Sequence, residues 1–290
     1  MPSWTAPAPA KVNLTLRILG RRVDGYHELE SLVAFAGCGD RLTLCAGPQL
    51  ELVVYGPTAA QSGAIADNLV LRAAHALAAR IGGLTLGHFT LTKELPAGAG
   101  LGGGSADAAA ALRLLAEANH LAPDDGRILD AARTTGADVS VCLDPQPRMM
   151  RGIGDIVSAP VALPKLGIVI IHPGVAMPTP PVFAALRMRP GEQRPAQPAS
   201  GDAPGERDAL LDWLAMVPND LEPPAISIAP AISEVLRMIA ALPGCRLARM
   251  SGSGSACFGL FDDEPAAATA AGHLAAAPAG WWVRASSIGG

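Results

Sequence analysis

One glycine-rich segment carries most of the information about this fold: Leu95-Pro96-Ala97-Gly98-Ala99-Gly100-Leu101-Gly102-Gly103-Gly104-Ser105-Ala106-Asp107. Five glycines within seven residues leave the backbone N–H groups accessible to an anion. A predicted helix at residues 106–119 follows, with Ser105 as its cap and Asp107 in its first turn, where a carboxylate suits the helix dipole. A helix N-terminus binds phosphate well. The segment therefore predicts a polyphosphate site at residues 96–106, and a flexible connector that happens to precede a helix is the alternative.

Two familiar phosphate motifs do not account for this segment. Gly98, Gly100 and Gly103 match the G-x-G-x-x-G pattern of dinucleotide-binding folds. That pattern follows a buried parallel strand, whereas Pro96 intervenes here and the predicted strand at residues 88–95 is polar on one face. The loop contains no lysine, so the G-x-x-x-x-G-K-[ST] pattern is absent as well.

Around this segment the chain mixes strands and helices without strict alternation. Residues 11–19 alternate apolar and polar side chains, which predicts a half-buried strand, and Asp24-Gly25 predicts a turn after it. Further predicted strands lie at residues 41–46, 50–55, 88–95, 166–171, 247–250, 257–261 and 282–286, and helices at residues 64–81, 106–119, 125–134, 208–216 and 231–241. This order favours an α+β fold over a doubly wound sheet.

We expect two lobes, an N-terminal one at residues 1–155 and a C-terminal one at residues 156–290. Residues 189–207, rich in Pro, Gly, Gln and Ala, predict a flexible insertion in the second lobe.

Composition narrows the class of protein and its partners. Half of the 290 residues are apolar and the formal net charge is −4, with no basic run, so no nucleic-acid partner is expected. Five cysteines without a C-x-x-C pair favour a reduced protein over a disulfide framework or a zinc site. The chain shows neither a signal peptide nor an apolar stretch of membrane-spanning length, which predicts a cytoplasmic protein with no membrane partner.

Several motifs together resemble one kinase family. The glycine-rich segment resembles the phosphate loop of the GHMP superfamily, which comprises galactokinase, homoserine kinase, mevalonate kinase and phosphomevalonate kinase. Other segments are similar to the 4-diphosphocytidyl-2-C-methyl-D-erythritol kinases within it. These are Ala8-Pro9-Ala10-Lys11-Val12-Asn13-Leu14, Asp24-Gly25-Tyr26-His27-Glu28-Leu29, Gly136-Ala137-Asp138-Val139, His172-Pro173-Gly174 through Pro178-Thr179-Pro180 and Phe183, and Ser251-Gly252-Ser253-Gly254-Ser255-Ala256. Ser140 departs from the family, which usually has proline there, and the 189–207 insertion carries no motif.

The resemblance implies a fold, a reaction and partners. The fold would be the two-lobed α+β architecture of GHMP kinases, with the active site in the cleft between the lobes. The enzyme would transfer the γ-phosphoryl group of ATP, with Mg²⁺, to the 2-hydroxyl of 4-diphosphocytidyl-2-C-methyl-D-erythritol in the non-mevalonate route to isoprenoid precursors. The partner would be that small molecule, and the protein would be a monomer or a weak homodimer. No residue is predicted to bind a metal.

The resemblance also assigns roles to the catalytic residues and to a nucleotide contact. Asp138 would be the general base, and Lys11 would keep it ionised and favour the developing alkoxide. Asn68 would contact adenine. From the residues alone, Asp138 could instead cap a turn, Lys11 could be a solvated lysine at a strand edge, and Asn68 could cap a helix.

The substrate-binding residues implied by the resemblance are Asn13, Tyr26, His27, Thr179 and Phe183. Tyr26 and Phe183 would stack on the cytosine base, and His27 would read its edge. Packing around a hairpin is the alternative for Tyr26 and His27. Two other functions stay open at this point: a kinase of the same superfamily acting on another alcohol, and a nucleotide-binding protein of this fold without turnover.

Overall fold

The structure is a computed structural model that describes residues 2–195, 203–274 and 277–290. The chain forms two compact units. Unit 1 consists of Met1–Lys11, Gly39–Ala97 and Gly102–Pro145, and unit 2 of Val12–Cys38, Gly98–Leu101 and Gln146–Gly290. These units are discontinuous because β1 (Ser3–Asn13) and β3 (His27–Gly47) each contribute residues to both. The predicted two-lobe division at residue 155 stays a prediction.

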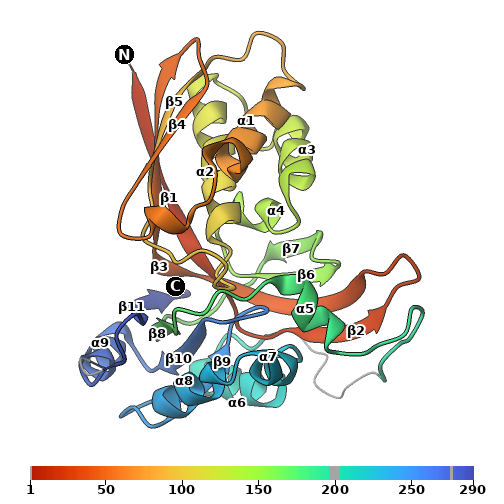
Figure 1. The fold of residues 1–290 in the computed structure, drawn as a ribbon, viewed down its shortest axis with the longest axis vertical. Helices are drawn as coiled ribbons and strands as arrows, with labels where there is room; N and C mark the ends of the chain where they lie inside the picture. The colour runs from red at the N-terminus through yellow and green to blue at the C-terminus, as the bar shows by residue number, and fades with distance from the viewer. Residues whose placement is uncertain (1, 196–202, 275–276) are drawn as a thin grey trace. The chain divides into compact units, whose positions relative to one another are not determined.

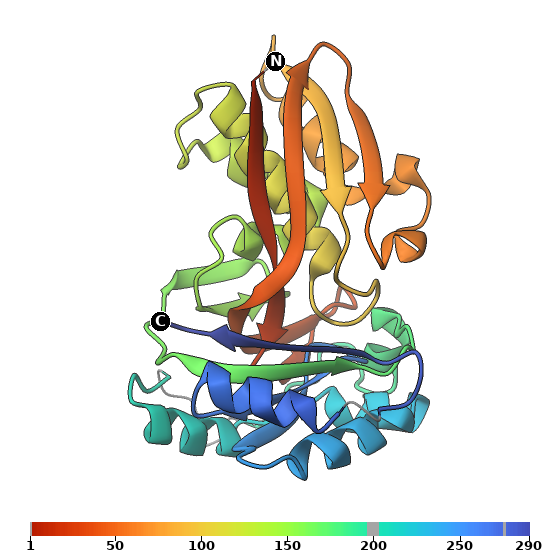
Figure 2. The same cartoon turned by 90° about the vertical axis from the view of Figure 1, so that its left-hand side faces the viewer.

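Unit 1 packs helices on one face of a sheet. The strands β4 (Glu51–Tyr55) and β5 (Leu86–Thr92) pair in parallel, and β5 pairs antiparallel with the second half of β3. Alternate residues of β5 are buried, as expected of a strand with one covered face. The four helices are α1 (Leu69–Ala78), α2 (Gly103–Ala118), α3 (Gly126–Thr135) and the short α4 (Val139–Cys142). Figures 1 and 2 show them on the same side of this sheet.

The helix after the glycine-rich segment starts earlier than its sequence predicts. Gly102 caps α2 in the left-handed conformation, with φ of 63°, and the helix begins at Gly103. The predicted cap at Ser105 is therefore wrong: Ser105 lies in the first turn and Asp107 in the second. Glycine is suited to this cap because it adopts a positive φ without strain. Gly103, Gly104 and Ser105 of the glycine-rich segment are therefore part of the helix.

In unit 2 the predicted strand at residues 11–19 is divided. It forms the end of β1 and the start of β2 (Arg17–Arg21), with a break between them. The prediction of a half-buried strand is wrong, because the polar residues Asn13, Thr15 and Arg17 are buried as well. Polar partners make this burial possible: the Asn13 amide donates to Ser31 Oγ at 2.8 Å, and Thr15 Oγ1 accepts from the Leu32 N–H at 2.9 Å.

The turn predicted at Asp24-Gly25 is confirmed, with Gly25 at a φ of 93°. It joins β2 to β3 in an antiparallel pair. On its other edge, the same part of β3 pairs with β6 (Arg148–Gly152), which pairs with β7 (Ile156–Pro160).

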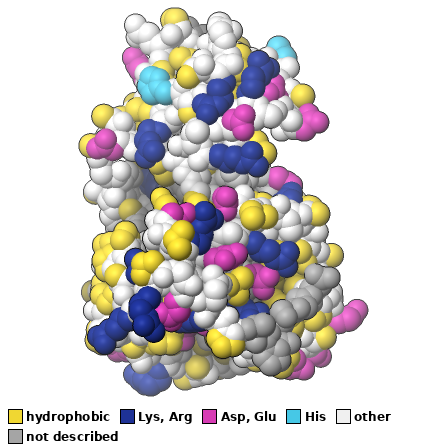
Figure 3. Space-filling model, turned by 90° about the vertical axis from the view of Figure 1, so that its right-hand side faces the viewer, with side chains coloured by type: hydrophobic (Ala, Val, Ile, Leu, Met, Phe, Trp, Pro, Cys, Tyr) yellow, Lys and Arg dark blue, Asp and Glu magenta, His cyan; other side chains and the backbone are white. Residues whose placement is uncertain are grey.

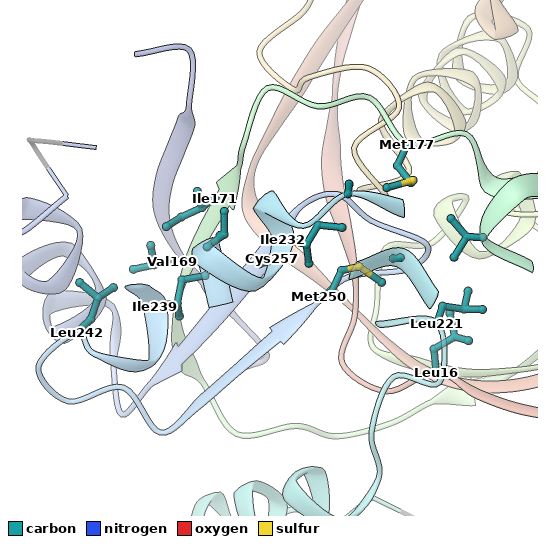
Figure 4. Packing of buried hydrophobic residues seen from close by; sticks show 14 of the residues in the cluster. Leu16, Val169, Ile171, Met177, Leu221, Ile232, Ile239, Leu242, Met250 and Cys257 are labelled. Carbon is teal, nitrogen blue, oxygen red and sulfur yellow. The ribbon is translucent and has the colours of Figure 1, made fainter. Parts of the chain in front are cut away.

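A second sheet of four antiparallel strands has the order β11-β8-β10-β9. Its strands are β8 (Leu166–His172), β9 (Leu247–Met250), β10 (Cys257–Phe261) and β11 (Trp282–Ile288). The helices of this unit are α5 (Thr179–Ala184), α6 (Arg207–Met216), α7 (Glu222–Ile228), α8 (Ala231–Ala240) and α9 (Glu264–Gly272). Figure 4 shows the core of unit 2, where Val169 and Ile171 of β8 lie among Ile239, Met250 and Cys257.

The predicted insertion at residues 189–207 is only partly described, since residues 196–202 lie outside the described ranges. Its first part is tied to β2. The N–H groups of Gly191 and Arg194 donate to Arg21 and Leu19 at 2.7 and 2.8 Å, and the Arg21 N–H donates to Glu192. The edge of β2 provides residues 191–194 with backbone partners that no local pattern reveals. The flexibility predicted for residues 189–207 stays a prediction.

Charged side chains of both signs are interspersed on the face of the molecule in Figure 3. Within the described parts of the chain, no helix combines the length and the apolar character needed to cross a membrane.

Candidate active site

Unit 1 contains a lysine and aspartate pair from two distant segments. Lys11 Nζ on β1 lies 2.9 Å from Asp138 Oδ2, immediately before α4. The lysine side chain is 5% exposed and the aspartate side chain 38% exposed. Asp138 occupies the N-cap position of α4, but its side chain accepts no capping hydrogen bond. The carboxylate is thus directed at Lys11 instead of the helix, with one side open to solvent.

The Lys11 side chain also lies against the cap of α2. A Cβ atom built on Gly102 would come within 3.1 Å of Lys11 Cβ and 3.2 Å of Lys11 Cε. The aliphatic stem of Lys11 and the N-cap of α2 are therefore neighbours within unit 1, and a side chain at position 102 would displace the lysine.

The first turn of α2 presents unpaired backbone donors. The Ala106 N–H donates to the Gly102 carbonyl at 2.9 Å, so the N–H groups of Gly103, Gly104 and Ser105 precede the first bond of the helix. Free N–H groups and the positive end of the helix dipole suit a phosphate. Earlier in the segment, the Ala97 N–H donates to Gln61 Oε1 at 3.1 Å.

Asn68 caps a helix. Its Oδ1 accepts a hydrogen bond from the Val70 N–H at 2.9 Å at the start of α1. The following residue, Leu69, lies near the phosphate segment, because a Cβ on Gly104 would be 3.4 Å from Leu69 Cδ1. The helix-cap alternative is thus observed, and a contact from Asn68 to adenine stays a prediction.

The middle of the glycine-rich segment belongs to unit 2, where a second small-residue loop holds it. Ser251 Oγ donates to the Gly100 carbonyl at 3.0 Å, and the Ala256 N–H donates to the Ala99 carbonyl at 2.9 Å. The Met177 N–H donates to the Gly98 carbonyl at 3.2 Å. The carbonyl groups of Gly98, Ala99 and Gly100 thus all accept hydrogen bonds from unit 2. These bonds fix the path of the backbone through the middle of the glycine-rich segment.

Gly100→Ala is expected to disturb this packing. Gly100 has a φ of 77°, and a Cβ there would lie 2.6 Å from the Ser251 carbonyl oxygen. The matched control is Gly63→Ala, since Gly63 has a φ of 71° but no atom within 4 Å of the added Cβ. Both variants carry the left-handed penalty of about 1–2 kcal/mol. Thermal unfolding should show a larger loss of stability for Gly100→Ala, and nucleotide titration should show weaker binding only there. Equal losses of stability and of nucleotide affinity in the two variants would mean that the backbone around Gly100 can move to accommodate the added methyl group.

His27 and Phe183 lie together in unit 2. Their ring centroids are 5.0 Å apart and their planes are inclined by 42°. Burial, assisted by the charges of Arg21 and Arg194, lowers the pKa of His27 below its ordinary value. The imidazole is therefore neutral at neutral pH, and its buried Nε2 has no hydrogen-bond partner among the described residues. Tyr26, next to it, is 62% exposed.

Of the remaining predicted substrate residues, Asn13 is buried and Thr179 begins α5. The Asn13 N–H donates to Ser251 Oγ at 3.1 Å, and its Oδ1 has no partner within the described ranges. Thr179 Oγ1 lies 3.0 Å from Ser253 Oγ. Both residues thus contact the 251–256 loop.

Sequence reasoning missed a buried cluster behind the phosphate segment, formed by Asp40, Lys93 and Asp107. One signal was available, because Lys93 is one of only three lysines and stands two residues before Leu95. It also missed Asn219, whose amide donates to the carbonyls of Met250 and Gly252, both at 2.8 Å. No local pattern singles out this asparagine.

Known families match both halves of the chain. Residues 68–144 match the GHMP kinases N terminal domain, and residues 205–279 match the GHMP kinases C terminal domain. Among solved structures, that of a homoserine kinase from Cytophaga hutchinsonii has a TM-score of 0.73 over 100% of this chain and 96% of that one, at 19% identity. At this identity the likeness concerns the fold, and with the domain matches it confirms the predicted α+β GHMP-kinase fold.

Closer relatives share one name. The chain is 55% identical to the 4-diphosphocytidyl-2-C-methyl-D-erythritol kinase of Methylorubrum extorquens (strain PA1), over 96% of this chain and 97% of that protein. It is 54% identical to the protein of the same name from Rhodopseudomonas palustris (strain BisB18), over 97% and 94%. A solved 4-(cytidine 5'-diphospho)-2C-methyl-D-erythritol kinase has 37% identity and a TM-score of 0.79, covering 99% of this chain and all of the other.

Proposed function

The chain belongs to the 4-diphosphocytidyl-2-C-methyl-D-erythritol kinases of the GHMP kinase family, and from this membership we propose that it phosphorylates the 2-hydroxyl of 4-diphosphocytidyl-2-C-methyl-D-erythritol with ATP. One observation supports the proposal most: the Lys11 and Asp138 pair lies beside the anion-binding start of α2 within unit 1. A base, a cation and phosphate-binding amides are the groups that phosphoryl transfer to an alcohol requires. The reaction is a step of the non-mevalonate route to isoprenoid precursors.

In the proposed mechanism Asp138 takes the proton of the substrate hydroxyl. Its Oδ2 is held by Lys11, which leaves Oδ1 to accept the proton. The alcohol oxygen then bonds to the γ-phosphorus as the bond to the β-phosphate oxygen breaks, and ADP leaves. The buried ammonium of Lys11 holds Oδ2 of the carboxylate in place and would stabilise negative charge on the alcohol oxygen as it forms.

The nucleotide phosphates would be bound by residues 96–106, with the N–H groups of Gly103, Gly104 and Ser105 directed at them. Among the described residues, no group of three or more His, Cys, Asp or Glu side chains could hold a metal alone. Mg²⁺ would accompany ATP, with phosphate oxygens and water as its main ligands, the usual arrangement in kinases. When bound, Mg²⁺ would neutralise charge on the transferred group. No side chain is assigned to it.

Recognition of the cytidine half would depend on His27, Phe183 and Tyr26 in unit 2. The neutral imidazole of His27 offers one donor and one acceptor, as needed to read the edge of a cytosine ring. Phe183, already in contact with His27, provides an aromatic face. Tyr26 is exposed enough to close over a base. Asn13 and Thr179, linked to the 251–256 loop, would orient the rest of the substrate.

Tyr26→Ala and Phe183→Ala are expected to raise KM for the cytidyl substrate by about 5-fold to 150-fold, since stacking on a base contributes about 1–3 kcal/mol. KM for ATP should change little. Tyr55→Ala is the matched control, because Tyr55 is the other tyrosine of the chain and is similarly exposed, at 58%. Steady-state kinetics with each substrate varied in turn would measure these effects. An increase in KM for ATP alone would contradict the stacking role.

The proposed function is tested with a panel of alcohols and ATP, including the cytidyl substrate, methylerythritol phosphate, homoserine and mevalonate. We expect ADP release only with the cytidyl substrate. Turnover of another alcohol would favour a different kinase of the superfamily, and nucleotide binding without turnover of any alcohol would favour a non-catalytic nucleotide-binding protein. The contact between His27 and Phe183 favours the cytidyl substrate over the others.

Four further predictions remain proposals for this protein. These are a cytoplasmic location, a monomer or weak homodimer, the two-lobe division at residue 155, and an active site in the cleft between the lobes. Size-exclusion chromatography with light scattering would test the oligomeric state.

A further inference from the structure

The strand end that leads into the glycine-rich segment is tied to one buried carboxylate in unit 1. Asp40 Oδ1, on β3, accepts hydrogen bonds from the N–H groups of Glu94 and Leu95 at 2.6 and 2.8 Å. Its Oδ2 accepts another from Lys93 Nζ. Three consecutive residues at the exit of β5 are thus attached to a single side chain.

The helix that follows the segment is tied to the same lysine. Lys93 Nζ also donates to Asp107 Oδ2 of α2 at 2.8 Å. Asp107 comes four residues after Gly103, so the two share one face of the helix. A Cβ on Gly103 would lie 3.4 Å from Lys93 Nζ and 3.5 Å from Asp40 Oδ2. The first residue of α2 therefore rests directly on the cluster.

The cluster is closed to solvent and carries unbalanced charge. Asp40, Lys93 and Asp107 are 3%, 5% and 3% exposed. Two carboxyl groups share one ammonium, and Asp107 Oδ1 has no hydrogen-bond partner within the described part of the chain. Burial raises the pKa of Asp107 to about 7; Asp40 adds to this effect and Lys93 opposes it. Apolar side chains could often fill such a volume without loss of stability, which suggests that the cluster has a role other than stabilising the fold.

We propose that Asp40, Lys93 and Asp107 are positioning residues for the nucleotide: they hold both ends of the glycine-rich segment and so determine where the amides of α2 meet the phosphates. The proposal rests on the proposed function, because it needs phosphates at the start of α2. None of the three side chains has to touch the ligand. Their effect is transmitted through Gly103 and the strand end at Glu94 and Leu95.

The first test is Asp107→Ala, which removes the acceptor of Lys93 from α2. We expect KM for ATP to rise about tenfold, with kcat and KM for the alcohol substrate nearly unchanged, because a lost charge-assisted bond displaces the phosphate-binding turn. Asp107→Asn keeps an oxygen acceptor for Lys93 and should give a smaller increase. Titration with ATP in the absence of the alcohol should show the same order of affinities.

The control is Ile128→Ala in α3, which removes a buried side chain elsewhere in unit 1. It should lower the unfolding temperature without raising KM for ATP. If Asp107→Ala does not fold, Asp107→Asn carries the test. The proposal is overturned if the Asp107 variants bind ATP as the wild type does, or if Ile128→Ala weakens ATP equally. A wild-type protein that neither binds nor uses ATP would instead refute the proposed function.

A pH series gives an independent measurement. The groups that face Asp107 are Lys93, Asp40 and Cys142 of α4, and burial keeps the Cys142 thiol neutral by raising its pKa to about 12. Asp107 is protonated below its pKa and ionised above it, and only the ionised carboxylate makes the charge-assisted hydrogen bond to Lys93 that ties α2 to the cluster. From about pH 6 to about pH 8, the wild type should therefore gain ATP affinity relative to Asp107→Asn. The ratio of the two affinities cancels the titration of ATP itself, and a constant ratio would contradict the coupling.

Discussion

Asp138→Asn is expected to lower kcat by about two to four orders of magnitude, the usual effect of losing a general base. The amide has nearly the shape of the carboxyl group and its oxygen can still accept a hydrogen bond from Lys11. It cannot take a proton from the substrate hydroxyl. ATP binding and the unfolding temperature should therefore change little. Steady-state and single-turnover kinetics at saturating concentrations of both substrates would measure the effect on the chemical step.

The matched control is Asp130→Asn. Asp130 is an exposed aspartate of α3 in the same unit, 61% exposed and 3.6 Å from Arg133. Its substitution should leave kcat unchanged. Near-normal kcat in Asp138→Asn would remove Asp138 from the mechanism, and an equal loss in both variants would point to a general effect of lost negative charge.

Lys11→Met is expected to lower kcat by about two to three orders of magnitude, because the lysine charge matters most as the alkoxide develops. Methionine preserves much of the apolar stem that packs against Gly102, so the cap of α2 should keep its place. The control is Lys165→Met in unit 2, where the lysine is 63% exposed and 3.5 Å from Glu264. Kinetics with ATP and the alcohol varied separately would assign the loss to kcat or to KM.

A loss of ATP affinity with unchanged kcat would instead make Lys11 a phosphate ligand. The double variant Lys11→Met with Asp138→Asn separates these cases further. Residues that act as one unit give non-additive effects, so we expect the double variant to be about as slow as the slower single variant. Full additivity would mean that the two residues act independently, despite the 2.9 Å contact.

The glycine-rich segment shows how much of this site can be predicted from local sequence. Glycine can adopt a positive φ at any position in a chain. The first N–H groups of a helix have no partner within the helix, whatever surrounds it. The prediction of a phosphate site at residues 96–106 follows from these two properties alone. The turn at Gly25 and the glycine-rich route into a helix are predictable for the same reason. Even so, the sequence predicts the start of α2 three residues too late, because Gly102 takes the left-handed conformation and caps the helix.

The roles of Asp138 and His27 could be predicted only from resemblance to a known family, not from local sequence. Nothing in their immediate neighbours distinguishes a catalytic aspartate from a turn cap, or a base-reading histidine from a packed one. Only resemblance to a family of known chemistry favoured the functional reading. The contact from Asp138 to Lys11 joins residues far apart in the sequence, as does the ring contact between His27 and Phe183. Such contacts form only after the strands and helices have packed.

Periodicity and glycine content were thus enough to predict the α+β class, most helices and strands, and the glycine-rich route into a helix, since these depend on interactions between residues close in the chain. The buried polar face of residues 13–17, the pairing of residues 191–194 with β2, and the cluster of Asp40, Lys93 and Asp107 depended on folding. Each requires a polar partner that is remote in sequence. A buried charge or backbone amide is tolerable only once such a partner is in place, and the packing of distant segments is what supplies it.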